Sequence, residues 1–456
     1  MLNRSIVSTL LLRVFLIILC SVACLTSEVS AYEQNTLWDP ELGVELSYFP
    51  DTGYPEQKNS NISLRWQLEA QHTFTESTSP LRLDLFARYD AVDKKRTHWD
   101  IRELSWDYQP SNIWQPSNLW QPSNQSQSAD QWLLRAGVLQ QFWGVTESRH
   151  LLAVLNQTDL IENIDGEDKL GQPMLNLAYF YTTGAINGYM LPGFRERTYP
   201  GRKGRLRMPV KIGDARYQSG AGQKHIDWAL RWQHTVDQLD LALFHFHGTS
   251  RDPWFALETP QPTLSSLSHN DKHAYYSPEL QPVYDITDLT GLEVQYLWQN
   301  WAFKLELLSD SGIGQWDRNT AVTTGFEYTA VNAFNTGIDM GLLVEWLFDD
   351  RGNDAPIDRV HDGWFLGTRW TMNNFASTQA LLGVIIDENS KNWSLEVEHR
   401  LAPNMLLTIE SRWFSHQQHM PQSGWDWLNT LNQDPSHKLS FLQQEDYFRA
   451  EISWYF

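Results

Sequence analysis

The sequence predicts an all-β protein, a transmembrane antiparallel up-and-down β-barrel of about 16 to 18 strands. Three observations predict this fold: an apolar leader over residues 1–31, segments of alternating polarity along residues 32–456, and a last alternating strand that ends at Phe456. After the leader, no continuous apolar run is long enough for a membrane helix. The chain would therefore cross a membrane as a closed barrel, because only helices and closed barrels satisfy every backbone group in lipid.

The leader has the features of a cleaved signal peptide. Arg4 precedes an apolar run that ends in small residues, the last of which is Ala31. We therefore predict that residues 1–31 are a signal peptide, that the chain is exported to the periplasm, and that residues 32–456 form a β-barrel in the cell outer membrane. A retained helical anchor and a lipoprotein cleaved before Cys24 are the alternatives.

Alternation separates an apolar face from a charged face in each predicted strand. In residues 81–90, leucine, alanine and tyrosine alternate with arginine, aspartate and phenylalanine. Side chains in a strand point to opposite faces with period two, so one face would meet lipid and the other a water-filled lumen. A soluble β-sandwich also alternates, but aromatic residues near strand ends and charges of both signs on the second face favour the membrane barrel. The predicted strands are residues 41–49, 62–71, 81–90, 98–108, 132–142, 174–182, 185–191, 226–233, 239–247, 289–298, 301–307, 322–334, 338–348, 363–372, 376–386, 393–401, 404–414 and 448–456. The predicted lumen-facing residues are Arg82, Asp84, Arg88, Arg135, Arg231, Glu396, Glu398, Arg400, Arg449 and Glu451.

The last predicted strand carries a more specific mark. Phe448, Ile452, Trp454 and Phe456 fall on one apolar face, and the strand stops on an aromatic residue. This pattern resembles the closing strand of outer-membrane proteins, which the barrel-assembly machinery reads. The resemblance implies that these four residues form a barrel-assembly signal and that the machinery is a partner of this chain.

A long irregular region near 143–210 interrupts the strands and holds the candidate selectivity residues. Long loops in compact folds are usually functional or disordered, and rings of charged side chains set the selectivity of many pores. We expect an acidic stretch folded into the barrel to face a basic cluster and form a constriction. The alternatives are that the basic run contacts lipopolysaccharide phosphates or has no special role. The acidic candidates are Glu162, Asp165, Glu167 and Asp168, and the basic candidates are Arg195, Arg197, Arg202, Lys203, Arg205 and Arg207.

No metal site, catalytic site or cofactor is predicted. Both cysteines lie in the leader, so the mature chain has no thiol ligand or nucleophile. Residues 165–168 lack the full acidic spacing of a calcium loop, and His245 with His247 is too small a set for a metal site. A tandem Pro-Ser-Asn repeat over residues 110–124 is interpreted as a duplicated loop, with an aromatic-tipped binding loop as the alternative.

Three short motifs resemble a strand pair found in porin-like barrels, among them alginate-export-type porins and related outer-membrane families of unknown function. They are Arg-Glu-Leu-Ser-Trp-Asp-Tyr at 102–108, Leu-Arg-Ala-Gly at 134–137 and Phe-Trp-Gly at 142–144. In those barrels the Trp-Gly pair opens a long loop. The resemblance implies a porin-like barrel here too, and this chain departs from the pattern by inserting the Pro-Ser-Asn repeat between the two strands.

The predicted function is a porin-like channel for passive passage of small hydrophilic solutes, anions among them. A net charge of -20 argues against nucleic acid as a partner, which leaves outer-membrane lipid, lipopolysaccharide and a small solute. A plugged receptor, or a secretion or assembly partner without an open pore, is the alternative. An outer-membrane enzyme is a further alternative that is not favoured, because no Gly-x-Ser-x-Gly or His-Glu-x-x-His motif is present.

Overall fold

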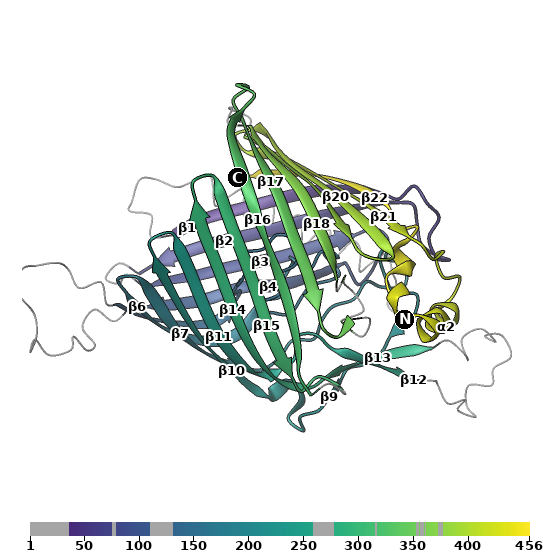
Figure 1. Ribbon diagram of the computed structural model, residues 1–456, viewed down its shortest axis with the longest axis horizontal. Coiled ribbons are helices and arrows are strands. Elements are labelled where there is room, and N and C mark those ends of the chain that lie inside the picture. Colours follow the sequence, from purple (N-terminus) through teal and green to yellow (C-terminus); the bar gives the residue numbers. More distant parts are fainter. Residues whose placement is uncertain are drawn as a thin grey trace, which may run out of the picture.

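The computed structural model describes residues 36–74, 79–109, 131–258, 278–314, 317–352, 355, 360, 362–372 and 377–456. The predicted signal peptide and the Pro-Ser-Asn repeat lie outside these described residues. The chain forms a closed barrel of 18 antiparallel strands, because β1 pairs with β22 as well as with β2 (Figure 1). The barrel strands are β1 (Thr36–Tyr48), β2 (Ser60–Thr73), β3 (Pro80–Asp90), β4 (His98–Tyr108), β5 (Gln131–Leu139), β6 (Gln172–Tyr181), β7 (Gly184–Pro192), β10 (Ile226–Val236), β11 (Leu239–Thr249), β14 (Ile286–Trp298), β15 (Trp301–Ser311), β16 (Asn319–Ala333), β17 (Ile338–Asp349), β18 (Gly363–Met372), β19 (Thr378–Ile386), β20 (Ser390–Ala402), β21 (Met405–His416) and β22 (Tyr447–Tyr455).

The predicted fold class is therefore confirmed, at the upper end of the expected strand number. Strand ends differ from the prediction by a few residues. For example, β5 stops at Leu139 instead of residue 142, because the backbone N–H of Gln141 donates to Asn156 Oδ1 at 2.8 Å instead of to a neighbouring strand. The chain leaves the wall at this point and enters the barrel.

The period-two pattern sorts side chains between an outer and an inner face. Along β10, Trp228 and Leu230 are exposed, whereas Asp227, Ala229 and Arg231 between them are buried. The exposed set is apolar, as a lipid-facing wall requires, and the inward set carries the charges. In β4 a register shift against β3 places an extra residue at Arg102, and such a bulge re-aims a side chain.

The two ends of the barrel differ in the length of their connections. At the end where β1 begins and β22 finishes, several turns have two residues, at 182–183, 237–238, 299–300 and 403–404. The opposite end carries most of the long connections, including 140–171, 193–225, 250–285 and 417–446. Outer-membrane barrels combine short periplasmic turns with long external loops in this way. The irregular region near 143–210 is thus two long connections separated by β6 and β7.

The long connections also build a small cap beside the barrel mouth. Strands β12 (Trp254–Glu258) and β13 (Glu279–Tyr284) pair, and the short β8 (Lys211–Ile212) and β9 (Arg216–Tyr217) join β13. Helix α2 (Gly424–Gln433) lies at the same end (Figure 1), next to the 3-10 turns η4 (Pro435–His437) and η5 (Ser440–Leu442), and η1 (Gly222–Lys224) precedes β10. The fully buried Trp427 of α2 packs in a cluster with Leu280 and Phe441. No helix among the described residues has the length and apolar character needed to cross a membrane.

Candidate functional site

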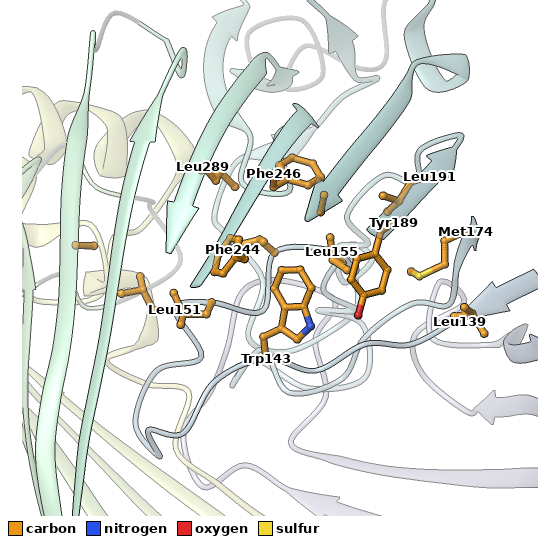
Figure 2. Close-up of a cluster of buried hydrophobic side chains, with 14 residues drawn as sticks. Leu139, Trp143, Leu151, Leu155, Met174, Tyr189, Leu191, Phe244, Phe246 and Leu289 are labelled. Carbon is orange, nitrogen blue, oxygen red and sulfur yellow. The ribbon is translucent and has the colours of Figure 1, made fainter. Parts of the chain in front are cut away.

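The connection between β5 and β6, residues 140–171, folds into the barrel, and we call it the inward segment. One side of it is apolar and packs against the inner wall. Trp143 lies 4.8 Å from the ring of Phe244 and 5.6 Å from that of Tyr189, measured between ring centroids. Figure 2 shows Trp143, Leu151 and Leu155 of the segment gathered with these wall residues. Burial of this apolar face holds the segment inside the barrel.

Three wall glutamates anchor the start of the inward segment through its backbone. Glu306 on β15 is fully buried and accepts hydrogen bonds from the backbone N–H groups of Val145 and Thr146, at 2.7 and 2.9 Å. Glu345 on β17 accepts from the next two N–H groups, at 2.8 and 2.9 Å. Glu293 on β14 accepts from the N–H of Gly144 at 3.0 Å. The five consecutive N–H groups of residues 144–148 thus each donate to one of three wall carboxylates. These bonds satisfy backbone donors that would otherwise be buried without partners.

Glycine is required at position 144, where the backbone of the inward segment comes close to Glu306 of the wall. Its φ is 130°, and a Cβ placed there would lie 2.8 Å from a carboxylate oxygen of Glu306. Sequence reasoning did not nominate Glu293, Glu306 or Glu345. The available signal was an acidic residue on the inward-facing side of each of three predicted strands.

The acidic side of the inward segment faces the other wall. Glu162 accepts from Arg88 Nε on β3 at 2.7 Å, and Asp165 accepts from Arg412 on β21 at 2.9 Å. Asp159 accepts from Arg102, the residue at the β4 bulge, at 2.7 Å. The segment therefore spans the lumen from β14, β15 and β17 to β3, β4 and β21.

Buried ion pairs continue this contact into the wall where the barrel closes. Glu45 on β1 accepts from both Arg88 and Arg96, and only 2% of it is exposed. A buried charge is tolerated when it is paired and hydrogen-bonded. The pairs of this arginine–carboxylate cluster are Arg88 with Glu45 and Glu162, Arg96 with Glu45 and Asp90, Arg449 with Glu410, and Arg65 with Glu41 and Glu451.

A cavity of about 510 Å³ lies between the inward segment and this wall. Its charged lining consists of Arg65, Arg88, Arg96, Arg102, Lys169 and Arg449 together with Glu45, Asp84, Glu162, Glu167, Asp168, Glu410 and Glu451. A smaller cavity of about 60 Å³ on the side of the long connections shares three of these residues, Arg96, Glu162 and Arg449. Those three residues therefore separate the two spaces.

Two acids of the inward segment have raised pKa values. Burial within the barrel raises the pKa of Asp168 to about 7, and the nearby Asp165 and Glu162 carboxylates add to the effect. The Asp168 side chain nevertheless opens onto the large cavity. Burial likewise raises the pKa of Asp165 to about 6, although Arg412 opposes the shift.

The predicted basic run is not gathered opposite the acidic stretch. Arg195 binds Asp100, with 2.8 Å between Nη2 and the carboxylate, and Arg197 binds Asp252 at 2.5 Å. Further along, Arg205 binds Glu445 at 2.8 Å, the exposed Arg202 binds Glu56 at 2.8 Å, Arg207 lies over the Tyr54 ring, and Lys203 lines the small cavity. Of the predicted acids, Glu162 and Asp165 bind the strand residues Arg88 and Arg412. The constriction between the two runs stays a prediction.

The remaining predicted lumen residues mostly bind polar side chains of other strands that the sequence did not nominate. Arg82 and Arg135 both bind Asp107; Arg231 binds Glu293 at 3.2 Å; Asp84 accepts from Gln67 at 3.1 Å; Glu396 accepts from Arg412 at 2.9 Å; Arg400 donates to the Pro403 carbonyl at 2.9 Å; Glu398 is exposed opposite Gln379. Glu167 of the predicted acidic stretch lies 3.4 Å from His150. Of the predicted assembly-signal residues, Phe448, Ile452 and Trp454 lie on β22, and Phe456 follows its last residue.

The two histidines considered for a metal lie on the outer face. His247 Nδ1 is 2.8 Å from the carboxylate of Asp288, and His245 hydrogen-bonds Thr290 at 2.9 Å. Within the described residues, no group of three or more possible ligands forms a metal site.

Several solved structures match this chain at low sequence identity. A variant of the Rh. blastica porin aligns with a TM-score of 0.39 and 10% identity, covering 92% of this chain and all of that chain. Pseudomonas putida OprB gives 0.41 and 10%, covering 92% and 94%, and OmpT of Vibrio cholerae gives 0.40 and 9%, covering 92% and 99%. No protein-family model and no curated protein matches the sequence.

Proposed function

We propose that this protein is a porin-like channel of the outer membrane that passes small hydrophilic solutes passively. The observation that carries the proposal is the polar cavity between the inward segment and the arginine-rich wall of a closed barrel. On its other side, the inward segment packs apolar side chains against the inner wall. Solutes would therefore travel along β1–β4 and β21–β22, past Arg96, Glu162 and Arg449.

The membrane assignment rests on the outer face. Aromatic side chains such as Trp38, Trp99 and Trp298 are among the exposed hydrophobic residues of the strands, and interfacial girdles of outer-membrane barrels need this composition. The apolar band would contact lipid, and lipopolysaccharide would cover the end that carries the long connections. Export through the signal peptide and folding by the barrel-assembly machinery remain part of the same proposal.

The cavity supports weak charge selectivity. Six cationic and seven carboxylate side chains line it, so their net charge is close to zero. An anion preference was expected from the basic run, but those residues bind acids elsewhere. Weak and multiple interactions let a solute leave as readily as it arrives, and a lining of paired charges has this property.

Single-channel recording tests the proposal. Refolded protein, checked for folding by heat-shifted gel mobility, would be inserted into a planar bilayer under a salt gradient. We expect stable conductance and a reversal potential near zero. Absence of conductance from folded protein would refute the channel and favour a plugged receptor, which the cap around Trp427 also suits.

A further inference from the structure

An exposed aromatic ring sits inside the charged cavity. Phe142 lines it, and 58% of this residue is exposed. Single exposed apolar side chains are ordinary on outer surfaces and need no explanation. Within a lumen lined by arginines and carboxylates, however, this ring is an apolar surface that faces water and solutes.

The ring is held in place. Its neighbour Trp143 is buried in the apolar cluster, and the backbone on either side is anchored by Asn156 and Glu293. The imidazole of His150 meets the Phe142 ring edge to face, with 4.9 Å between centroids and 76° between planes. A group fixed in this way binds a ligand without losing much conformational entropy.

The polar groups around Phe142 favour uncharged ligands. The five arginines of the lining each have a carboxylate partner, so an ionic solute would have to compete with existing ion pairs. Neutral hydrogen-bonding side chains, Gln140, Gln141 and Thr408, also line the space. Hydroxyl groups can donate to the carboxylates and accept from the guanidinium groups without breaking these pairs.

We propose that the cavity binds neutral saccharides, with Phe142 contacting the apolar face of a sugar ring while the surrounding side chains bond its hydroxyl groups. Pyranose rings combine a flat C–H face with peripheral hydroxyls, which matches an aromatic ring set among paired charges. This inference rests on the proposed function, because it places the same cavity on the route of the solute.

The test uses maltose as the probe and the folded full-length mature barrel in lauryldimethylamine oxide, a detergent without sugar. Saturation-transfer NMR titration would give the dissociation constant. We expect Phe142→Ala to weaken maltose binding about five- to tenfold, in keeping with the worth of one aromatic contact, and Phe142→Tyr to preserve it. Trp99→Ala removes an exposed aromatic of β4 that does not line the cavity, and we expect it to bind maltose like the wild type.

Sorbitol serves as the ring-free comparator and is expected to bind less tightly than maltose. Failure of the wild type to bind maltose, or unchanged binding by Phe142→Ala, would overturn the inference. Conductance is measured separately on the same preparations. A barrel that conducts but does not bind maltose would refute the saccharide site alone. A folded barrel that binds maltose but does not conduct would support the site and refute the channel.

Discussion

The anchoring of the inward segment by buried wall carboxylates predicts a large local effect of removing Glu306. Its carboxylate accepts from the N–H groups of Val145 and Thr146 and from the Thr146 hydroxyl at 2.7 Å. Hydrogen bonds to charged groups are worth about 1.5–3 kcal/mol each. In Glu306→Ala, water entering from the lumen would replace part of the lost hydrogen bonding. The substitution should therefore cost about 3–4 kcal/mol of local stability.

Hydrogen–deuterium exchange measures this loss directly. A loss of about 3–4 kcal/mol corresponds to exchange that is about 10²- to 10³-fold faster for the amides of residues 145 and 146. Glu306→Gln keeps the shape and one acceptor oxygen, so we expect an increase of about tenfold. Glu103→Ala is the control, because the described hydrogen bond of Glu103 is to Ser105 on the same strand. Unchanged protection in Glu306→Ala would refute the anchoring.

Four further predictions concern the cavity and its supports. Glu162→Gln removes one carboxylate from the lining, so the reversal potential should shift toward anions, while Glu103→Gln, which lies outside the lining, should leave it unchanged. Lowering the pH from 8 to 5 should shift the potential the same way, as Asp168 and Asp165 take up protons at about pH 7 and 6. The pKa values of both acids in the folded protein are raised above the ordinary value of 3.8. Their contribution to the free energy of unfolding is therefore complete below pH 3.8 and is lost as the pH rises through 6 to 7. Replacing each aspartate with asparagine should flatten this pH dependence in unfolding experiments. Gly144→Ala forces a positive φ on alanine and crowds a pinned carboxylate, so it should cost about 1–3 kcal/mol and lower the temperature of the heat-shifted gel transition.

The strands could be predicted because their signal is local. Alternation along residues 226–233 assigns Trp228 to lipid and Arg231 to the interior without reference to any other strand, and the structure places them so. The resemblance of residues 142–144 to porin-like barrels, in which Trp-Gly opens a long loop, likewise predicts a long connection at this point. Ends of strands were less certain, because a single side chain such as Asn156 can take a backbone donor away from the ladder.

The partners of the acidic stretch could not be predicted from local pattern. Glu162 binds Arg88 of β3, and Arg88 shares Glu45 of β1 with Arg449 of β22, because the last strand closes against the first. A run of neighbouring basic residues was a stronger sequence signal than isolated arginines on separate strands. In the folded barrel the isolated strand arginines lie close together, because the barrel closes where their strands meet. The residues of the basic run after β7 instead bind separate acids, as Arg195, Arg197 and Arg205 do.

The central claim, that solutes pass between the inward segment and the β1–β4 and β21–β22 wall, is tested most directly by cysteine modification during recording. Both native cysteines lie in the predicted signal peptide, so a single introduced thiol would be unique in the mature chain. Thr408→Cys places it in the cavity lining, and Ile409→Cys places it on the opposite face of β21. The account predicts that a charged methanethiosulfonate reagent reduces the current of Thr408→Cys and leaves that of Ile409→Cys unchanged. A conducting Thr408→Cys channel whose thiol is modified with no change in current would contradict it.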